Sequence, residues 1–300
     1  MSGFVFGTHN AAFVQVMYEQ YLRDPTSVPD EWRLLFDNGK LAELPVIPTS
    51  RDEVAGLGAR ASGLGIQPEA PSPEPRTPSP ALTPITGPAA RLVQNMTDSL
   101  SVPTATSFRE IAVATLDDRR KALNAALAAR QIKVSYTHLI GFAIVQAARH
   151  LPVMTHSFQE VEGKPHRSDP GAVSLGLAVD VERKDGTRGL LVPVIKHADA
   201  LDFTAFYETY EALVAKARTG KLLPDDLMGG TITLTNPGTL GTVASVPRLM
   251  KGQGSIIATG AIRDTGAGRV MTISSTYDHR IIQGAESGMF LRRVDQLLQG

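Results

Sequence analysis

One histidine in this chain occupies a position that the surrounding backbone would fix. His279 follows an apolar, β-branched run over residues 270–276 and precedes Gly284, after which a helical pattern begins. This order predicts a strand that ends in a turn with an imidazole at its tip. A free imidazole titrates near neutral pH and therefore suits general acid–base catalysis. On these residues alone, a structural histidine at a strand end is the alternative.

A second informative segment runs over residues 230–242. Threonines alternate with apolar residues as far as Thr235, and Asn236, Pro237 and Gly238 follow. The alternation predicts a strand that enters a Pro-Gly turn. Taken by itself, this is an ordinary strand with threonines on its exposed face.

The other histidines give weaker signals. None are paired at metal-ligand spacing and no His-Glu-x-x-His motif occurs, so no metal site is expected. His138 lies within an apolar helical pattern and is expected to be a core or interface histidine. The remaining candidates fall in predicted loops, where we expect solvated side chains: His150, His156, His166 and His197.

Composition sets limits on the class of protein. The chain has 300 residues, 42% of them hydrophobic, enough for one core of about 200 residues plus extra segments. Thirty basic and thirty acidic side chains balance, so no nucleic-acid partner is expected. There is no cysteine, no apolar run long enough to span a membrane and no signal peptide pattern. A cytoplasmic protein without a membrane partner is therefore expected.

The chain divides into three parts by composition. Residues 1–38 predict two short amphipathic helices, the first capped by Asn10 and the second carrying Trp32. Residues 39–88 contain a proline-rich stretch without apolar periodicity, which predicts a flexible linker. Two short helices cannot bury their apolar faces alone, so they must pack on another body.

Residues 89–300 alternate between helical and strand patterns, which predicts an α/β or α+β sandwich with one sheet and helices packed against it. Helices are expected near residues 92–100 and 116–129, from a cap at Ser135 to about residue 147, from a cap at Asp202 to residue 218, and from about residue 285. Strands are expected over residues 104–113, 172–181, 189–195, 231–235, 255–262 and 269–276.

The segment from Tyr277 to Gly284 resembles the histidine motif of the 2-oxo acid dehydrogenase E2 acyltransferases, which share a fold with chloramphenicol acetyltransferase. The resemblance implies that His279 is the general base for a thiol and that Thr235 donates to the oxyanion. It also implies coenzyme A as substrate, a lipoyl group supplied by another protein, and a homotrimer with active sites between subunits. Those enzymes usually carry Asp or Asn four residues after the histidine, where this chain has Gln283.

The helix pair over residues 1–38 resembles the extreme N-terminus of the E1 component of 2-oxoglutarate dehydrogenase. Helix pair, linker and E2-type domain together are similar to the actinobacterial E1–E2 fusions, whose motif also carries a glutamine, so Gln283 joins the expected site. We therefore expect the helices to dock on an E1 body outside this chain. No thiamine-diphosphate motif or lipoyl-domain motif is found in the sequence.

The resemblance implies succinyl transfer between a lipoyl-bound thioester and coenzyme A, within a 2-oxoglutarate dehydrogenase complex of the tricarboxylic acid cycle. The implied partners are a lipoyl-bearing E2 protein, an E1 thiamine-diphosphate domain and the E3 dihydrolipoamide dehydrogenase. Two alternatives remain: a trimerising scaffold that has lost turnover, which Gln283 favours, and a free-standing small-molecule acetyltransferase.

Overall fold

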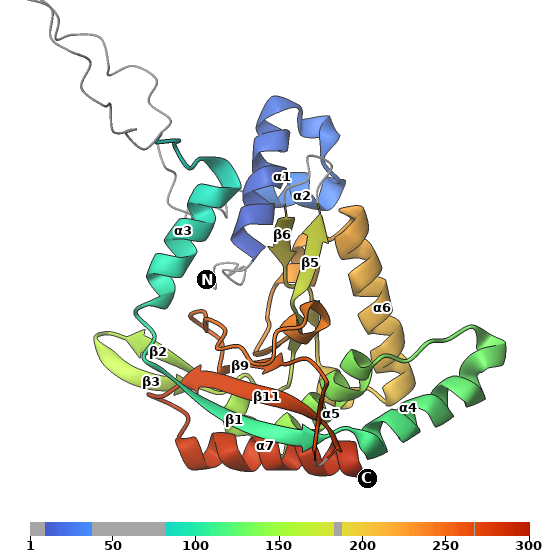
Figure 1. The fold of residues 1–300 in the computed structure, drawn as a ribbon. Coiled ribbons are helices and arrows are strands. Elements are labelled where there is room, and N and C mark those ends of the chain that lie inside the picture. Colours follow the sequence, from blue (N-terminus) through green and yellow to red (C-terminus); the bar gives the residue numbers. More distant parts are fainter. Residues whose placement is uncertain (1–9, 38–81, 183–187, 267) are drawn as a thin grey trace, which may run out of the picture.

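The computed structural model describes residues 10–37, 82–182, 188–266 and 268–300. Most of the predicted linker and the connection at residues 183–187, between two predicted strands, lie outside these ranges. Within them, one mixed sheet carries helices against it, as predicted, and a helix pair from the N-terminus sits at one end (Figure 1). Residues 87–300 are called the sheet domain below.

The helices are α1 (Ala11–Arg23), α2 (Asp30–Asp37), α3 (Gly87–Ser99), α4 (Ala114–Leu127), α5 (Tyr136–His150), α6 (Phe203–Thr219) and α7 (Gly284–Gln299). The strands are β1 (Thr104–Ala112), β2 (Ser157–Val161), β3 (Lys164–Ser168), β4 (Leu175–Leu177), β5 (Val179–Glu182), β6 (Arg188–Leu191), β7 (Val194–Ile195), β8 (Ile232–Thr235), β9 (Ser255–Thr259), β10 (Arg263–Thr265) and β11 (Gly268–Asp278). Among the described helices, none combines the length and apolarity that crossing a membrane requires.

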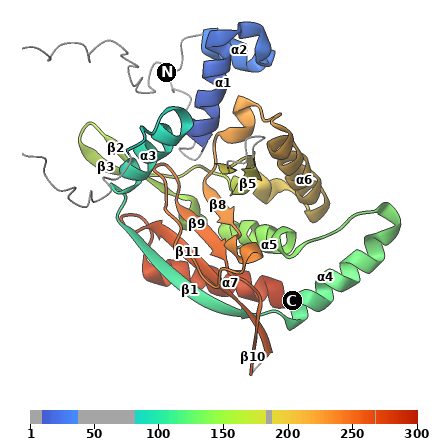
Figure 2. The same cartoon turned by 45° about the horizontal axis from the view of Figure 1, so that its top comes forward.

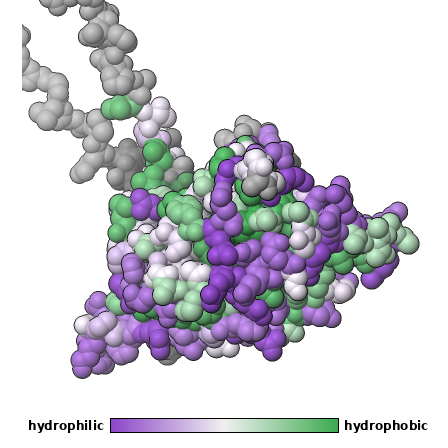
Figure 3. Space-filling view, turned by 60° about the horizontal axis from the view of Figure 1, so that its bottom comes forward, coloured by the Kyte–Doolittle hydropathy of each residue, from purple (hydrophilic) through white to green (hydrophobic). Residues whose placement is uncertain are grey.

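The main sheet has the order β1-β11-β9-β8-β4-β7, with β10 paired to β11. Strand β8 runs parallel to both β4 and β9, whereas β11 runs antiparallel to β9 and β1. Helix α7 packs on α5 and against β1 and β11, which places both helices on one side of the sheet (Figure 2). Viewed from the α7 side, the surface is largely hydrophilic with smaller apolar patches (Figure 3). The sheet therefore fixes where each strand end lies.

Two predicted helix starts are confirmed by their capping bonds. The Ser135 hydroxyl accepts from the His138 amide at 3.3 Å, and His138 Nδ1 accepts from the Ser135 amide at 3.1 Å. The Asp202 carboxylate accepts from the Ala205 amide at 2.8 Å. These side chains satisfy amides that the first turn of a helix leaves unpaired, so α5 and α6 begin where the sequence predicts.

The predicted role of Asn10 as a helix cap is wrong. Its side chain makes no capping bond and is 2% exposed. The amide nitrogen donates to the carbonyls of Val192 (3.0 Å) and Leu227 (2.7 Å), and the amide oxygen accepts from the Val192 N–H at 2.8 Å. A buried amide of this kind must be hydrogen-bonded. These long-range bonds, and not a bond to the first turn of α1, therefore determine where the Asn10 side chain lies.

The helix pair packs on the sheet domain of this chain, whereas its apolar faces were expected to need a body outside the chain. Val14 and Trp32 are fully buried in the same core as the sheet domain, and Trp32 Nε1 donates to the Leu222 carbonyl at 3.2 Å. The Phe13 and Phe36 rings surround Trp32 with centroids 5.9 and 5.5 Å away. The body that the short helices needed is therefore the sheet domain of the same chain.

Several strands differ from the prediction. The expected strand over 172–181 is split into β4 and β5, because the chain leaves the main sheet at Ala178 and pairs with β6. The expected strand over 189–195 is split into β6 and β7 in the same way. The β2–β3 hairpin and β10 were not predicted, and His156, expected to be solvated, is 7% exposed just before β2.

Asn10→Ala should loosen the helix pair from the sheet domain, because it leaves the Val192 and Leu227 groups without partners. Each buried polar group left without a hydrogen-bond partner lowers the stability of the docked helix pair by about 1–3 kcal/mol. Limited proteolysis of the full chain should then cut within α1 and α2 several times faster than in the wild type. Gln20→Ala, an exposed change on the same helix, should leave the rate unchanged. Equal cleavage of both variants would contradict this account of the docking.

Candidate functional site

The turn after β11 is built around Asp278, which is 2% exposed. Its carbonyl accepts from the amides of Ile281 (3.0 Å) and Ile282 (2.9 Å), and its own amide donates to the Gly254 carbonyl at 3.3 Å. The carboxylate accepts from Arg280 Nε at 2.9 Å and Arg280 Nη2 at 2.6 Å. Backbone and side-chain bonds of one residue thus determine the shape of the turn.

His279 lies at the outer point of this turn and is exposed. Its amide donates to the Pro103 carbonyl at 2.9 Å, and its Nδ1 lies 3.1 Å from the Ile282 carbonyl oxygen. Because a carbonyl can only accept, this contact places the ring proton on Nδ1. Nε2 then carries the lone pair and is free to take a proton.

Gln283 directly precedes α7. Among the described residues, no hydrogen bond joins its side-chain amide to the imidazole of His279. The Gln283 backbone N–H donates to Glu286 Oε2 at 2.7 Å, and its side chain is exposed. The hydrogen-bond partner of His279 Nδ1 is the Ile282 carbonyl instead. Ordering of the turn therefore comes from Asp278 and Ile282.

Thr235 is the last residue of β8 and is half-buried, and its hydroxyl has no hydrogen-bond partner among the described residues. The register aligns Ile232 with Ser255, and Ser255 with Tyr277, which is near the end of β11. Thr235 thus lies three positions, about 10 Å, from the end of the sheet where the His279 turn begins. Within one chain, the structure does not bring these two predicted site residues together.

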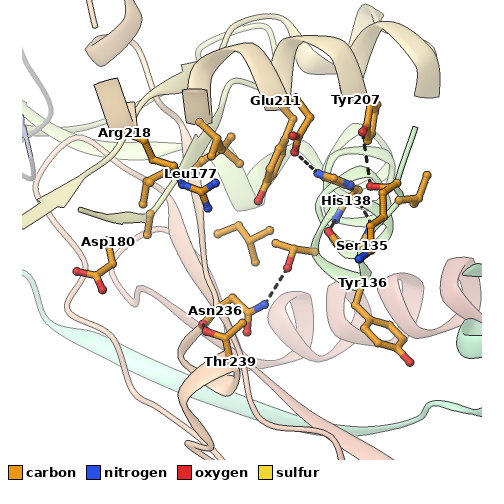
Figure 4. Close-up of a pocket in the computed structure, with 18 of the residues that line it drawn as sticks. Ser135, Tyr136, His138, Leu177, Asp180, Tyr207, Glu211, Arg218, Asn236 and Thr239 are labelled. Carbon is orange, nitrogen blue, oxygen red and sulfur yellow. Dashed lines mark hydrogen bonds and ion pairs between the residues drawn. The ribbon is translucent and has the colours of Figure 1, made fainter. Parts of the chain in front are cut away.

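A cavity of about 730 Å³ opens at the carboxyl end of β8, where Asn236 and Thr239 line it (Figure 4). Thr235 directly precedes Asn236 in the chain. Leu234, Asn236 and Thr239 contribute the β8 side, and the residues before and at the start of α5 contribute another wall. Asn236 Nδ2 donates to Thr137 Oγ1 at 2.8 Å, which joins the two walls. The cavity is large enough for part of a cofactor-sized ligand.

The cavity walls carry both signs of charge. Lys133 and Arg218 are exposed and form no ion pair with any described residue. Arg120 is engaged: it pairs with Asp117 and lies 4.5 Å from the Tyr136 ring centroid. The acidic groups lining the cavity are Asp180 and Glu211. Lys133 and Arg218 are therefore the cations available to a bound anion.

His138 lines the same cavity but has a structural role, as predicted. It is 3% exposed, and its Nε2 lies 2.9 Å from Glu211 Oε1. Its ring meets those of Tyr207 and Tyr210 edge-on, at 4.7 and 4.5 Å. Burial lowers the pKa of His138, although Glu211 opposes this, and burial raises the pKa of Tyr210 to about 12. The imidazole therefore stays neutral and holds α5 to α6.

The part of the chain that the structure describes contains no group of three or more His, Cys, Asp or Glu side chains placed to hold a metal ion. Sequence reasoning did not find the cavity residues Lys133 and Arg218. They belong to no motif, and only the fold brings the end of β8, the start of α5 and helix α6 together.

Comparison with protein families gives two matches. The family of 2-oxoacid dehydrogenases acyltransferase (catalytic domain) matches residues 78–300, and the 2-oxoglutarate dehydrogenase N-terminus matches residues 3–40. The chain is 52% identical over 227 residues to the multifunctional 2-oxoglutarate metabolism enzyme of Mycobacterium sp. strain JLS, and 50% identical to that of Mycolicibacterium vanbaalenii. Each match covers 71% of this chain and 18% of the relative, so the chain spans about a fifth of the length of these relatives.

Solved structures agree with this grouping. The dihydrolipoamide acetyltransferase of Azotobacter vinelandii has a TM-score of 0.65 at 26% identity, covering 78% of this chain and 97% of that chain. A probable dihydrolipoamide acetyltransferase from Listeria monocytogenes has the same fold, with a TM-score of 0.65, 24% identity and coverage of 73% and 94%. The predicted fold and family are confirmed: this chain belongs to the 2-oxoacid dehydrogenase acyltransferase family, whose catalytic domain makes up residues 78–300.

Proposed function

We propose that this chain transfers a succinyl group between a dihydrolipoyl arm on another protein and coenzyme A. The match of residues 3–40 to a 2-oxoglutarate dehydrogenase N-terminus, and the names of the mycobacterial relatives, support a 2-oxoglutarate dehydrogenase complex. The observation that carries the proposal is the exposed His279, whose Nδ1 is held by the Ile282 carbonyl and whose Nε2 has no hydrogen-bond partner among the described residues. The partners are a lipoyl-bearing E2 protein, an E1 thiamine-diphosphate domain and E3.

In the proposed reaction, His279 Nε2 takes the proton from the thiol of coenzyme A. A free thiol has a pKa about two units above that of a free imidazole, so this step is uphill and needs close positioning. The sulfur attacks the thioester carbonyl, and the free hydroxyl of Thr235 donates to the oxyanion, a contribution of about 3 kcal/mol. The intermediate collapses, the lipoyl thiolate leaves, and the proton returns to it from His279. No covalent acyl-enzyme forms.

The site requires two copies of the chain. Thr235 and the His279 turn lie toward opposite ends of the sheet, so one chain alone does not present both to one thioester. In a homotrimer with closed symmetry, His279 of one copy can face Thr235 of the next at each of the interfaces. The lipoyl arm and coenzyme A then meet between subunits.

In this proposal, part of coenzyme A occupies the cavity beside Thr235. Its phosphate groups need cations, and Lys133 and Arg218 are the lining cations that are not already paired. Glu211 is already hydrogen-bonded to His138. Asp180 is therefore the lining carboxylate whose charge would repel a bound anion. No metal is needed at any step.

The position of Gln283 is supported by an enzyme with similar structure. In the Azotobacter vinelandii acetyltransferase, a serine, a histidine and an asparagine four residues after the histidine have a described role in the catalytic mechanism. His279 and Gln283 have the same spacing. A longer amide at this position, exposed at the start of α7, suits contact with substrate or with the neighbouring copy better than support of its own turn.

The second candidate function is a trimerising scaffold without turnover. The observation that favours it is that, among the described residues, no hydrogen bond joins Gln283 to the imidazole, although Asp or Asn usually stands at this position. The purified chain, supplied with succinyl-dihydrolipoamide and coenzyme A, separates the two functions. Absence of transfer by a folded trimer would establish the scaffold.

His279→Ala should lower acyl transfer by roughly 10² to 10⁴, because the thiol then loses its positioned base. Circular dichroism should show an unchanged fold, since the ring is exposed. The matched control is His150→Ala, an exposed histidine at the end of α5, which should keep wild-type turnover. Transfer at the wild-type rate in His279→Ala would remove this residue from the mechanism.

Lys133→Ala should raise the KM for coenzyme A by about three- to tenfold while kcat changes little, because an exposed charge contributes modestly to anion binding. The difference should shrink as salt screens the phosphates. Lys164→Ala, an exposed change on β3, serves as control. An unchanged KM at low salt would place coenzyme A outside this cavity.

A further inference from the structure

The β2–β3 hairpin contacts the His279 turn through one aromatic ring. Phe158, half-buried on β2, lies under the guanidinium of Arg280, whose central carbon is 3.8 Å from the ring centroid. In Figure 1, the hairpin lies beside the end of β11 where the turn begins. A cation this close to an aromatic face is attracted to it and restricted in position.

We propose that Phe158 is a positioning residue for His279, acting through Arg280 and Asp278. This rests on the proposed function, in which His279 is the base. Phe158 does not touch the imidazole or the substrate. It sets the place of the guanidinium, and the guanidinium sets the place of the Asp278 carboxylate.

The connection from the Phe158 ring to His279 runs through consecutive contacts. Arg280 makes two parallel bonds to Asp278, and such a bidentate pair fixes orientation as well as distance. The Asp278 carbonyl accepts from the Ile282 amide at 2.9 Å, and the Ile282 carbonyl lies 3.1 Å from His279 Nδ1. A shift of Arg280 therefore moves the group that selects the tautomer of His279.

The base of the hairpin is fixed to the same part of the sheet. Ser255 Oγ donates to the Met154 carbonyl at 2.8 Å, and a Cβ at Gly254 would lie 2.5 Å from that carbonyl oxygen. The backbone before β2 is thus packed on Gly254, whose carbonyl accepts from the Asp278 amide at 3.3 Å. The turn is thus held at two places, by the segment before β2 through Gly254 and by the hairpin through the ring of Phe158.

The first test is kinetic and uses the full chain. Phe158→Leu removes the aromatic face and should lower kcat about three- to thirtyfold with an unchanged KM for coenzyme A, whereas Phe158→Tyr keeps the face and should retain activity. Val161→Ala on the same strand is the control. In an Arg280→Met background, Phe158→Leu should have no further effect, because the ring then has no cation to hold. Additive losses, or a wild-type kcat in Phe158→Leu, would overturn the proposal.

The second test needs no turnover. Nitrogen-15 NMR of histidine-labelled chain, with His279 assigned from a His279→Gln sample, reports which ring nitrogen carries the proton. The wild type and Phe158→Tyr should show the Nδ1–H tautomer, and Phe158→Leu should show a mixture. If the wild type transfers no acyl group, the proposed function fails, yet this measurement still decides the role of Phe158. An unchanged tautomer in folded Phe158→Leu overturns it, and Phe158→Met replaces that variant if melting shows that it does not fold.

Discussion

The buried carboxylate of Asp278 is the constraint on which the site depends. A carboxylate that is 2% exposed must be paired, and Arg280 pairs with it through two nitrogens. The backbone of the same residue closes the turn, and that turn delivers the Ile282 carbonyl to His279. The tautomer and orientation of the His279 ring, the proposed base, therefore depend on Asp278 at the end of β11. Because Asp278 belongs to a strand of the main sheet, the position of His279 is tied to the rigid core.

The sheet also explains why we propose a site shared between two copies of the chain. Parallel pairing of β8 with β9 and antiparallel pairing of β11 with β9 send Thr235 and His279 toward opposite ends. Helices α1 and α2 are attached to the same domain through two buried side chains. Asn10 donates to the Val192 and Leu227 carbonyls, and Trp32 donates to the Leu222 carbonyl. A segment similar to an E1 N-terminus is thus joined to the acyltransferase domain by buried polar bonds.

Much of this was predictable from the sequence, for physical reasons that also explain the failures. The starts of α5 and α6 could be predicted from Ser135 and Asp202, because a capping bond joins residues that are close in sequence. The strand before His279 could be predicted from its apolar run. The β2–β3 hairpin gave no signal, since most of its residues are exposed polar side chains without a two-residue period. The role of Asn10 was predicted wrongly because its hydrogen-bond partners are 182 and 217 residues away in the sequence. The contacts of Phe158 and of the cavity cations also join residues far apart in the sequence, so they could not be predicted either.

The central claim is that each site combines His279 of one copy with Thr235 of another. Co-expression of His279→Ala and Thr235→Val chains tests it most directly, with transfer between succinyl-dihydrolipoamide and coenzyme A as the measurement. Each variant alone should be nearly inactive, whereas random mixed trimers should regain about a quarter of wild-type activity, because some interfaces then pair an intact His279 with an intact Thr235. A mixture no more active than the separate variants would contradict a site shared between copies.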